Sequence, residues 1–322
     1  VVALRNGTMG WHLAGYELEH DMGRQAPEVS PEGLASACTA AARVGERFGV
    51  KTIDAATLKM WKREQDKRSL YLLDVRNPEE YEAGHLPDSI SAPGGQLVQA
   101  TDRYVGTLGS RIVLIDDTGV RATMTASWLS QMGWPEVVVL KNALANVELE
   151  KGPRKTPVLG FDDITADEIS PHTLTQIDAG GVNVVDFSDS RSYQRHHIPG
   201  AWFALRSRLD TALAKLPPAR LLVLASEDGV LAHLAAPEAT TLSADPVKVL
   251  TGGNAAWAAA GLPLSDGFEN MASEPDDVWL RPYDRDTGTE GAMREYLSWE
   301  IDLVSQIKRD GTVRFHSREA AN

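Results

Sequence analysis

The sequence predicts an α/β fold made of two similar units, each with a parallel β-sheet covered by helices on both faces. Short runs of Val, Ile and Leu, such as 111–115 and 221–225, alternate with stretches of helical periodicity. Uninterrupted apolar runs of this length are typical of strands buried on both faces. In addition, three elements recur in the same order at a nearly constant separation, so the chain repeats itself.

The composition is that of a globular protein rather than of a disordered or fibrous one. The chain has 322 residues, enough for two or three domains, and it is 43% hydrophobic and 24% charged. It contains no run of about 18 apolar residues, so we expect no membrane span. A net charge of −13 disfavours nucleic-acid binding, because phosphate contacts need a positive field.

Cys38 is the single cysteine of the sequence. This count excludes an internal disulfide and a cysteine-based metal cluster, and it fits a reducing, cytoplasmic compartment. Because Cys38 lies among alanines in a stretch of helical spacing, we interpret it as a buried small hydrophobe. A reactive thiol is the alternative. We expect neither a cofactor nor a metal ion.

The first repeated element is an apolar strand ending at an aspartate, with a histidine further along the chain. Asp74 and His85 form one copy, and Asp186 and His197 form the other, with the same spacing in both. Residues at the carboxyl end of a parallel strand lie at the edge where ligands bind. We nevertheless expect Asp74, Arg76 and Asp186 to connect neighbouring loops rather than to contact substrate. We expect both histidines to make structural hydrogen bonds ahead of a turn.

The second repeated element is a strand, a six-residue loop and a helix. Strand 111–115 leads into one loop and strand 221–225 leads into the other. Their position after parallel strands makes both loops candidate sites. Loop 1 consists of Asp116, Asp117, Thr118, Gly119, Val120 and Arg121, and loop 2 consists of Ser226, Glu227, Asp228, Gly229, Val230 and Leu231.

Two interpretations of the acidic residues in loop 1 remain open. Asp116 and Asp117 could cap the following helix and complement its dipole, which is the more common role. They could instead bind a cation or act as a general base. We expect Arg121 to pair with one of these carboxylates, although it could also recognise an anionic partner. His196 and His197 do not predict a metal site, because adjacent strand residues point to opposite faces.

The third repeated element is a closing strand followed by a helix that contains glycine and tryptophan. Segment 247–264 matches segment 1–18 residue for residue at several Leu, Gly, Trp and Ala positions, and a weaker copy begins at Val137. The match predicts a strand over 1–4 and places Trp11 and Trp257 in hydrophobic cores. We therefore interpret the chain as a segment of a longer one.

These repeats divide the chain into five parts. Residues 1–24 are interpreted as the tail of a truncated upstream unit A, residues 25–49 as a linker with a helix, residues 50–150 as unit B, residues 151–265 as unit C, and residues 266–322 as an extension. The extension contains an amphipathic helix that begins at Thr289 and stops at Gly311. We expect this helix to dock on a domain, and an oligomer interface, such as that of a homodimer, is the alternative.

Several motifs in these units resemble the signatures of rhodanese domains. In unit B they are Asp74-Val75-Arg76, Pro78-Glu79-Glu80-Tyr81, Gly84-His85-Leu86-Pro87 and Ala92-Pro93-Gly94, and the closing element of unit C, 249–261, is similar to the last strand and helix of the family. The resemblance covers nearly all of units B and C together with segment 1–18. Tandem rhodanese-related sulfurtransferases show the same organisation.

The resemblance implies a parallel five-stranded sheet with helices on both faces, and sulfur transfer as the chemistry. In this family a cysteine thiolate takes the sulfane sulfur of thiosulfate or a similar donor. It holds that sulfur as a persulfide and passes it to cyanide or another thiophile. The cysteine begins a Cys-x-x-Gly-x-Arg loop, whose backbone N–H groups and following helix N-terminus stabilise the anion.

Both complete units depart from this pattern. Loop 1 keeps Gly119 and Arg121, but Asp116 stands in the place of the cysteine. In loop 2, Ser226 replaces the cysteine and Leu231 replaces the arginine. Neither a carboxylate nor an unactivated hydroxyl can form a persulfide, so we expect both loops to be catalytically inactive.

The sequence therefore predicts a sulfurtransferase whose activity resides outside units B and C. Asp116 precedes Val137 by the same distance along the chain as Ser226 precedes Val247, and this spacing would put a catalytic cysteine of unit A upstream of Val1. Small-molecule sulfur donors and acceptors would then be partners of the intact protein, and units B and C would shape, dock or regulate unit A. The alternative is a non-enzymatic module whose acidic loops recognise a basic protein partner. A phosphatase-like activity would also need the loop cysteine.

Overall fold

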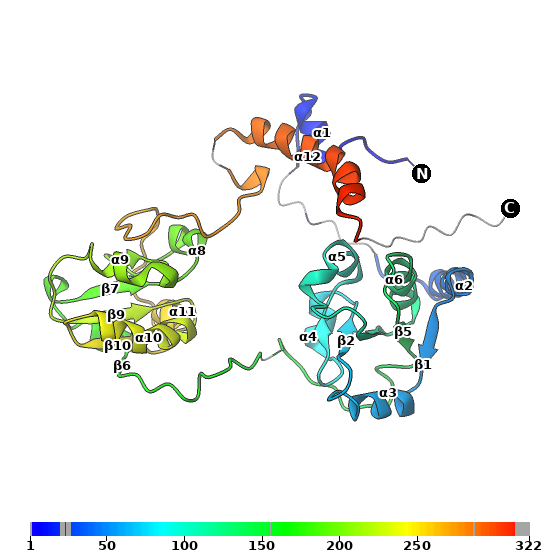
Figure 1. Cartoon of the computed structure of the whole chain (residues 1–322), viewed down its shortest axis with the longest axis horizontal. Helices are drawn as coiled ribbons and strands as arrows, with labels where there is room; N and C mark the ends of the chain where they lie inside the picture. The colour runs from blue at the N-terminus through cyan, green and yellow to red at the C-terminus, as the bar shows by residue number, and fades with distance from the viewer. Residues whose placement is uncertain (1, 20–22, 24–26, 155, 286, 313–322) are drawn as a thin grey trace. The chain divides into compact units, whose positions relative to one another are not determined.

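The computed structural model describes residues 2–19, 23, 27–154, 156–285 and 287–312 (Figure 1). The chain forms two compact units. The first consists of residues 1–156 and 294–322 and contains unit B, and the second consists of residues 157–293 and contains unit C.

Unit B contains a five-stranded sheet in the order β1-β5-β4-β2-β3, in which all neighbouring strands are parallel. The strands are β1 (Lys51–Ile53), β2 (Leu70–Asp74), β3 (Ile90–Ser91), β4 (Arg111–Ile115) and β5 (Val137–Leu140). The helices are α3 (Ala55–Lys62), α4 (Pro78–Ala83), α5 (Gly94–Gln99), the 3-10 turn η1 (Thr101–Arg103) and α6 (Val120–Gln131). Helix α2 (Pro31–Phe48), in the segment before unit B, packs against α6.

Unit C repeats this topology with the strand order β6-β10-β9-β7-β8, again entirely parallel. The strands are β6 (Glu168–Ile169), β7 (Asn183–Asp186), β8 (Trp202–Phe203), β9 (Leu222–Ala225) and β10 (Val247–Leu250). The helices are α7 (Pro171–Leu174), η2 (Ala179–Gly181), α8 (Ser190–Arg195), η3 (Arg206–Arg208), α9 (Leu209–Leu213), α10 (Val230–Leu242) and α11 (Gly253–Ala259). The 3-10 turn η4 (Pro282–Asp284) follows in the extension. The prediction of two five-stranded parallel sheets is confirmed.

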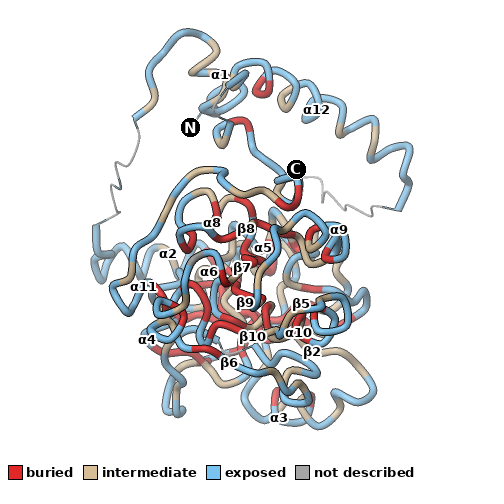
Figure 2. Tube along the Cα trace, turned by 90° about the vertical axis from the view of Figure 1, so that its left-hand side faces the viewer, coloured by how far each residue is buried: buried red, intermediate tan, exposed pale blue. Residues whose placement is uncertain are grey.

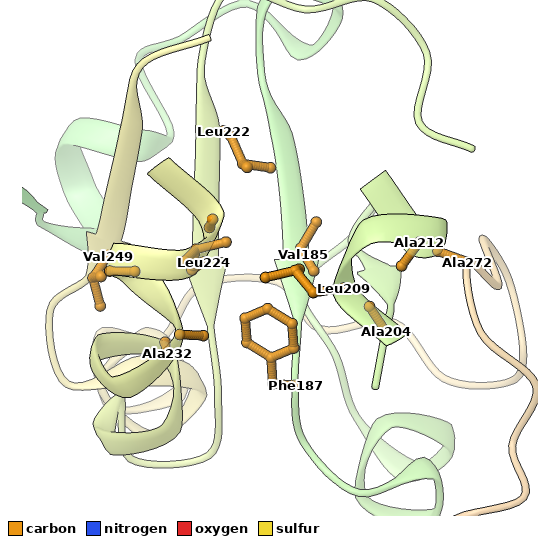
Figure 3. Close-up of a cluster of buried hydrophobic side chains, with 13 residues drawn as sticks. Val185, Phe187, Ala204, Leu209, Ala212, Leu222, Leu224, Ala232, Val249 and Ala272 are labelled. Carbon is orange, nitrogen blue, oxygen red and sulfur yellow. The ribbon is translucent and has the colours of Figure 1, made fainter. Parts of the chain in front are cut away.

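Each sheet is covered on both faces, because alternate strand residues enter two separate hydrophobic clusters. In unit C, Val185 and Leu224 pack with α9 and α10 in one cluster, which Figure 3 shows around Phe187. Val184 and Val223 face the other way and pack with residues of α7, α8 and α11. Unit B is built in the same way. Figure 2 shows the buried residues gathered on the strands and on the helix faces that cover them.

Two expectations for the start of the chain are wrong. The described residues 2–4 form no strand, and Val2 is 95% exposed, because no strand of the described residues pairs with them. A short helix, α1 (Gly7–Leu13), follows as the repeat suggests. Trp11 on α1 is 41% exposed rather than part of a core, whereas Trp257 on α11 is buried as expected.

The interpretation of Cys38 as a buried residue is also wrong. Cys38 is exposed on α2, which packs against α6. Ala41 is the buried residue of α2, and a Cβ atom on Gly45 would lie 3.1 Å from the methyl group of Thr123. Cys38 is therefore not on the part of α2 that is buried.

The amphipathic helix of the extension is confirmed as α12 (Thr289–Asp310), and Gly311 follows it with φ = +67°, as a helix-terminating glycine does. Ala292 and Met293 near its beginning are buried, but Ile301 and Val304 are mostly exposed. No helix among the described residues combines the length and apolar character needed to cross a bilayer.

Gly253 provides a test of how closely α11 packs against loop 2. Its φ is +62°, and a Cβ atom there would lie 2.1 Å from Ser226 O and 2.5 Å from Gly229 N. We predict that Gly253→Ala destabilises unit C by about 3 kcal/mol or more, because both the backbone conformation and the contact become unfavourable. The measurement is native-state hydrogen exchange of the β9 and β10 amides under increasing urea.

Gly267→Ala is the matched control for this substitution. Gly267 also has a positive φ, +89°, but a Cβ atom there meets nothing within 4 Å. The control therefore isolates the backbone strain, for which we expect about 1 kcal/mol. Equal destabilisation by the two substitutions would show that the close approach of α11 to loop 2 is unimportant.

Candidate functional site: the loops after strands β4 and β9

Loops 1 and 2 lie at equivalent places, each joining the carboxyl end of a central strand to a long helix. Loop 1 connects β4 to α6, and loop 2 connects β9 to α10. Gly119 and Gly229 precede the two helices with φ of +78° and +86°, a conformation that side chains disfavour. This left-handed turn directs the chain from the strand into the helix.

The Asp116 carboxylate occupies the centre of loop 1. It is 3% exposed, its Oδ1 accepts a hydrogen bond from Gly119 N at 2.6 Å, and its Oδ2 accepts one from Ala122 N at 3.1 Å. Burial raises the pKa of Asp116 above its ordinary value, against the lowering effect of the two amide hydrogen bonds. Asp116 thus acts as a cap, and its carboxylate takes up the amide donors that the loop directs inward.

Arg121 neutralises the acidic rim of loop 1. Its guanidinium donates to both carboxylate oxygens of Glu80, at 2.6 and 2.9 Å, and to Asp117 Oδ1 at 3.0 Å. The hydrogen bond to Glu80 is the main reason why the pKa of Arg121 is raised, and the same bond lowers the pKa of Glu80. Arg121 pairs with Asp117 as the sequence suggests, and it leaves Asp116 to the backbone amides.

Glu80 is a partner of loop 1 that the sequence analysis did not single out. It lies in α4, and its Oε2 also accepts from Asn77 N at 2.9 Å, so the start of that helix holds it in place. Arg121 lies 41 residues further along the chain. The spacing of Asn77 and Glu80 is typical of a capping box and predicts the start of a helix. It does not predict that Glu80 pairs with an arginine.

Loop 2 is held by different hydrogen bonds from those of loop 1. Ser226 is buried, and its Oγ accepts a weak hydrogen bond from Ala232 N at 3.3 Å. The first amides of α11 bind the loop from the other side, because Asn254 N donates to Ser226 O and Ala255 N donates to Glu227 O, both at 2.9 Å. Loop 2 therefore has its first two carbonyl groups fixed by a neighbouring helix.

The acidic residues of loop 2 are less constrained than those of loop 1. Asp228 Oδ1 accepts from Val230 N at 2.9 Å, and both Glu227 and Asp228 are exposed. Neither makes a salt bridge to a described residue. Leu231, which stands where loop 1 has its arginine, packs against the hydrophobic cluster between the sheet and α10.

The strand-end aspartates make buried polar contacts with neighbouring segments. Asp74 is fully buried and forms a salt bridge with Arg76 at 2.7 Å, and Arg76 also donates to Gly84 O at 2.7 Å. In unit C, Asp186 accepts from Ser188 N at 2.8 Å and from Asn254 Nδ2 at 2.7 Å. Asn254 thus connects the end of β7 to the start of α11, beside loop 2.

The two histidines make structural hydrogen bonds. His85 stacks on Tyr81 with ring centroids 3.8 Å apart, and its Nδ1 lies 3.0 Å from Tyr81 O. His197 repeats this arrangement on Tyr193, at 3.9 and 2.8 Å. His196 is exposed while His197 is buried. Across the described residues, no group of three or more His, Cys, Asp or Glu side chains is placed to bind a metal ion.

The ion pair of Glu80 and Arg121 makes unit B sensitive to pH. Because the pKa of Glu80 is lowered on folding, the pair stabilises the unit above the ordinary glutamate pKa of about 4.3, and this contribution is lost as the pH falls through the lowered value. We predict that Glu80→Gln costs up to about 1 kcal/mol at pH 7, an upper limit set by partial exposure. Urea unfolding between pH 7 and pH 3 measures the difference.

Glu79→Gln is the control for that substitution. Glu79 is the exposed neighbour of Glu80 and makes no salt bridge to a described residue. We expect the unfolding free energy of the Glu79→Gln variant to equal that of the unsubstituted protein at every pH. If Glu80→Gln also followed the unsubstituted protein, the ion pair would contribute nothing to stability.

Comparisons with known proteins place this geometry in a family. The model of the rhodanese-like domain matches residues 56–150 and 172–260, so it covers both units and both loops. A crystal structure of a thiosulfate sulfurtransferase from Pseudomonas aeruginosa is 47% identical, with a TM-score of 0.92 over 99% of this chain. The match spans 60% of the P. aeruginosa chain.

A rhodanese-related protein from Thermoplasma volcanium is more distant. It is 16% identical and matches 32% of this chain and 99% of its own length, with a TM-score of 0.29. A search of curated proteins gave no significant match. The domain matches cover more than half of the 322 residues, and they include both loops and four of the five strands of each sheet. This chain belongs to the rhodanese-like family.

Proposed function

We propose that this chain is part of a rhodanese sulfurtransferase in which units B and C do not carry sulfur themselves. One observation supports this most directly: the Asp116 carboxylate accepts hydrogen bonds from the Gly119 and Ala122 amides at loop 1. The 47% identical protein from P. aeruginosa is described as a thiosulfate sulfurtransferase, which supports thiosulfate as the donor. Units B and C would then shape, dock or regulate a catalytic unit.

The chemistry of sulfur transfer supports the assignment of both loops as inactive. A thiolate attacks the sulfane sulfur of thiosulfate, the S–S bond of the donor breaks, and sulfite leaves with the electron pair. Cyanide then attacks the outer sulfur of the persulfide, giving thiocyanate and restoring the thiolate. Asp116 and Ser226 offer only oxygen nucleophiles at this position. The carboxylate of Asp116 would also repel an approaching anionic donor.

The sulfur-carrying cysteine is proposed to lie in a further unit of the same protein. Segment 1–18 repeats the closing element of unit C, and the spacing of loop and closing strand that units B and C share would put the loop of that unit upstream of Val1. The P. aeruginosa relative supports this proposal, because the region similar to this chain is 60% of its length.

A second candidate function rests on loop 2. Glu227 and Asp228 are exposed and lack a salt bridge to the described residues, whereas Arg121 neutralises the acidic groups of loop 1. Unit C could therefore recognise a basic segment of a partner protein through these two carboxylates. The site would be non-enzymatic, and it is compatible with sulfur transfer elsewhere in the protein.

An activity assay of the 322-residue protein tests the proposal that both units are inactive. With thiosulfate and cyanide we predict thiocyanate formation no faster than with the Cys38→Ser variant, because Cys38 is the single thiol and lies on α2, outside both loops. The measurement is a colorimetric thiocyanate assay at equal protein concentration. Turnover well above background in the Cys38→Ser variant would overturn the proposal, because that variant contains no thiol.

A longer gene product that includes the proposed unit A would be the positive counterpart in the same assay. We expect it to form thiocyanate and to carry one cyanide-labile sulfur, detectable by mass spectrometry of the thiosulfate-treated protein. If the corresponding loop of unit A also lacked a cysteine, that result would contradict the proposed sulfur transfer.

A further inference from the structure

The second half of helix α12 exposes a row of large aliphatic side chains. Ala292 and Met293, near the beginning of the helix, are buried. Further along, Ile301 is 72% exposed, Val304 is 63% exposed and Ile307 is 37% exposed. Successive members of this row are three residues apart, so they lie along one side of the helix. A contiguous apolar surface of this kind is typical of an interaction site.

The residues around Val304 are arranged symmetrically along the chain. Ile301 lies three residues before Val304, and Ile307 lies three residues after it. Glu300 lies four residues before Val304, and Lys308 lies four residues after it. Three or four residues are close to one helical turn, so all of these side chains are on the side of α12 that carries Val304. An aliphatic residue thus mirrors an aliphatic residue, and a base mirrors an acid.

Two antiparallel copies of α12 would bring these mirrored positions together. If the two-fold axis passes at Val304, this residue faces its own copy and Ile301 faces the partner's Ile307. Glu300 then faces the partner's Lys308, and the symmetry forms this pair twice. A parallel pair would instead place like charges opposite each other, which is unfavourable. The charges therefore favour the antiparallel orientation.

Glu300 and Lys308 are accessible for pairing with a second copy. Both side chains are exposed, and neither makes a salt bridge to a described residue. Glu300 accepts a hydrogen bond from the Tyr296 hydroxyl, one turn earlier on the same helix. Opposite charges that flank an apolar stripe determine the orientation and the choice of partner in paired helices.

A lipid surface is a less suitable occupant of the stripe than a second copy. Helices that bind anionic membranes carry many lysines and arginines beside their apolar face. Residues 295–302 of α12 include Glu295, Glu300 and Asp302 but no lysine or arginine, and the whole chain has a net charge of −13. Anionic headgroups would repel this surface. A second copy supplies one base for each acid beside the stripe.

We propose that α12 pairs with α12 of a second copy of this chain, antiparallel and with the two-fold axis at Val304. The pair buries the aliphatic row and forms two salt bridges between Glu300 and the partner's Lys308. Because the paired surface is small, we expect a dissociation constant in the micromolar range. The proposal does not depend on the sulfur chemistry, because α12 lies outside both loops.

A charge exchange in the 322-residue protein tests the pairing. Sedimentation velocity over a concentration series measures the dissociation constant of the dimer. We expect Glu300→Lys to raise it about tenfold or more, because two positive charges then meet at both ends of the pair. The double variant Glu300→Lys/Lys308→Glu should return it to within about threefold of the unsubstituted value, since both salt bridges form again with reversed sign.

Asp302→Lys is the matched control, because it changes the net charge by the same amount. Asp302 is exposed and lies two residues before Val304, on the opposite side of the helix. We expect this variant to leave the dissociation constant within about threefold of the unsubstituted value.

A disulfide at the axis tests the register independently of the charges. Packed helix axes are about 8–10 Å apart, so the two copies of the residue 304 Cα atom would be about 4–5 Å apart, close enough for a disulfide. Cys38 is the single cysteine, so the Cys38→Ser background contains only an introduced thiol. In that background we expect Val304→Cys to form a covalent dimer under mild oxidation, and Asp302→Cys to stay monomeric.

Three results would overturn the proposal. The first is a protein that is monomeric at about 100 μM, well above the expected dissociation constant. The second is a dimer that Glu300→Lys weakens no more than Asp302→Lys does. The third is a Val304→Cys variant that cross-links no faster than the Asp302→Cys variant. A monomeric chain that binds vesicles of anionic phospholipid would assign the stripe to a lipid surface and would also overturn it.

Discussion

The interaction on which the account of this protein depends is the pair of hydrogen bonds from Gly119 N and Ala122 N to the Asp116 carboxylate. Backbone amides at the turn between a parallel strand and a helix point into the loop and favour an anion there. In a sulfur-carrying loop that anion is a thiolate or persulfide. Here a carboxylate of the chain accepts hydrogen bonds from two of these amides.

The two units stabilise their loops in different ways. Unit B fills its loop with a carboxylate and neutralises the rim through Arg121 and Glu80. Unit C has a neutral Ser226, and the first amides of α11 fix the loop through its carbonyl groups, which requires Gly253 to lack a side chain. Asp117 of loop 1 is exposed but paired with Arg121, whereas the exposed Glu227 and Asp228 of loop 2 make no salt bridge to a described residue.

Much of the fold could be predicted from the sequence because the repeat makes each unit a check on the other. The strands that carry loops 1 and 2, the capping role of Asp116 and the helix from Thr289 all follow from local patterns. Glu80 could not be found in this way, since its role depends on a contact 41 residues away. The burial of Cys38 and Trp11 was misjudged because burial depends on what packs against a helix rather than on the helix itself.

The central claim is that loop 1 retains an anion-stabilising site that Asp116 occupies, and Asp116→Cys in the Cys38→Ser background tests it most directly. The measurement is the rate of alkylation of this single thiol as a function of pH. We expect a thiol pKa clearly below the ordinary value of about 8.5, because the Gly119 and Ala122 amides would stabilise the thiolate. A thiol that titrates at the ordinary value would contradict the account.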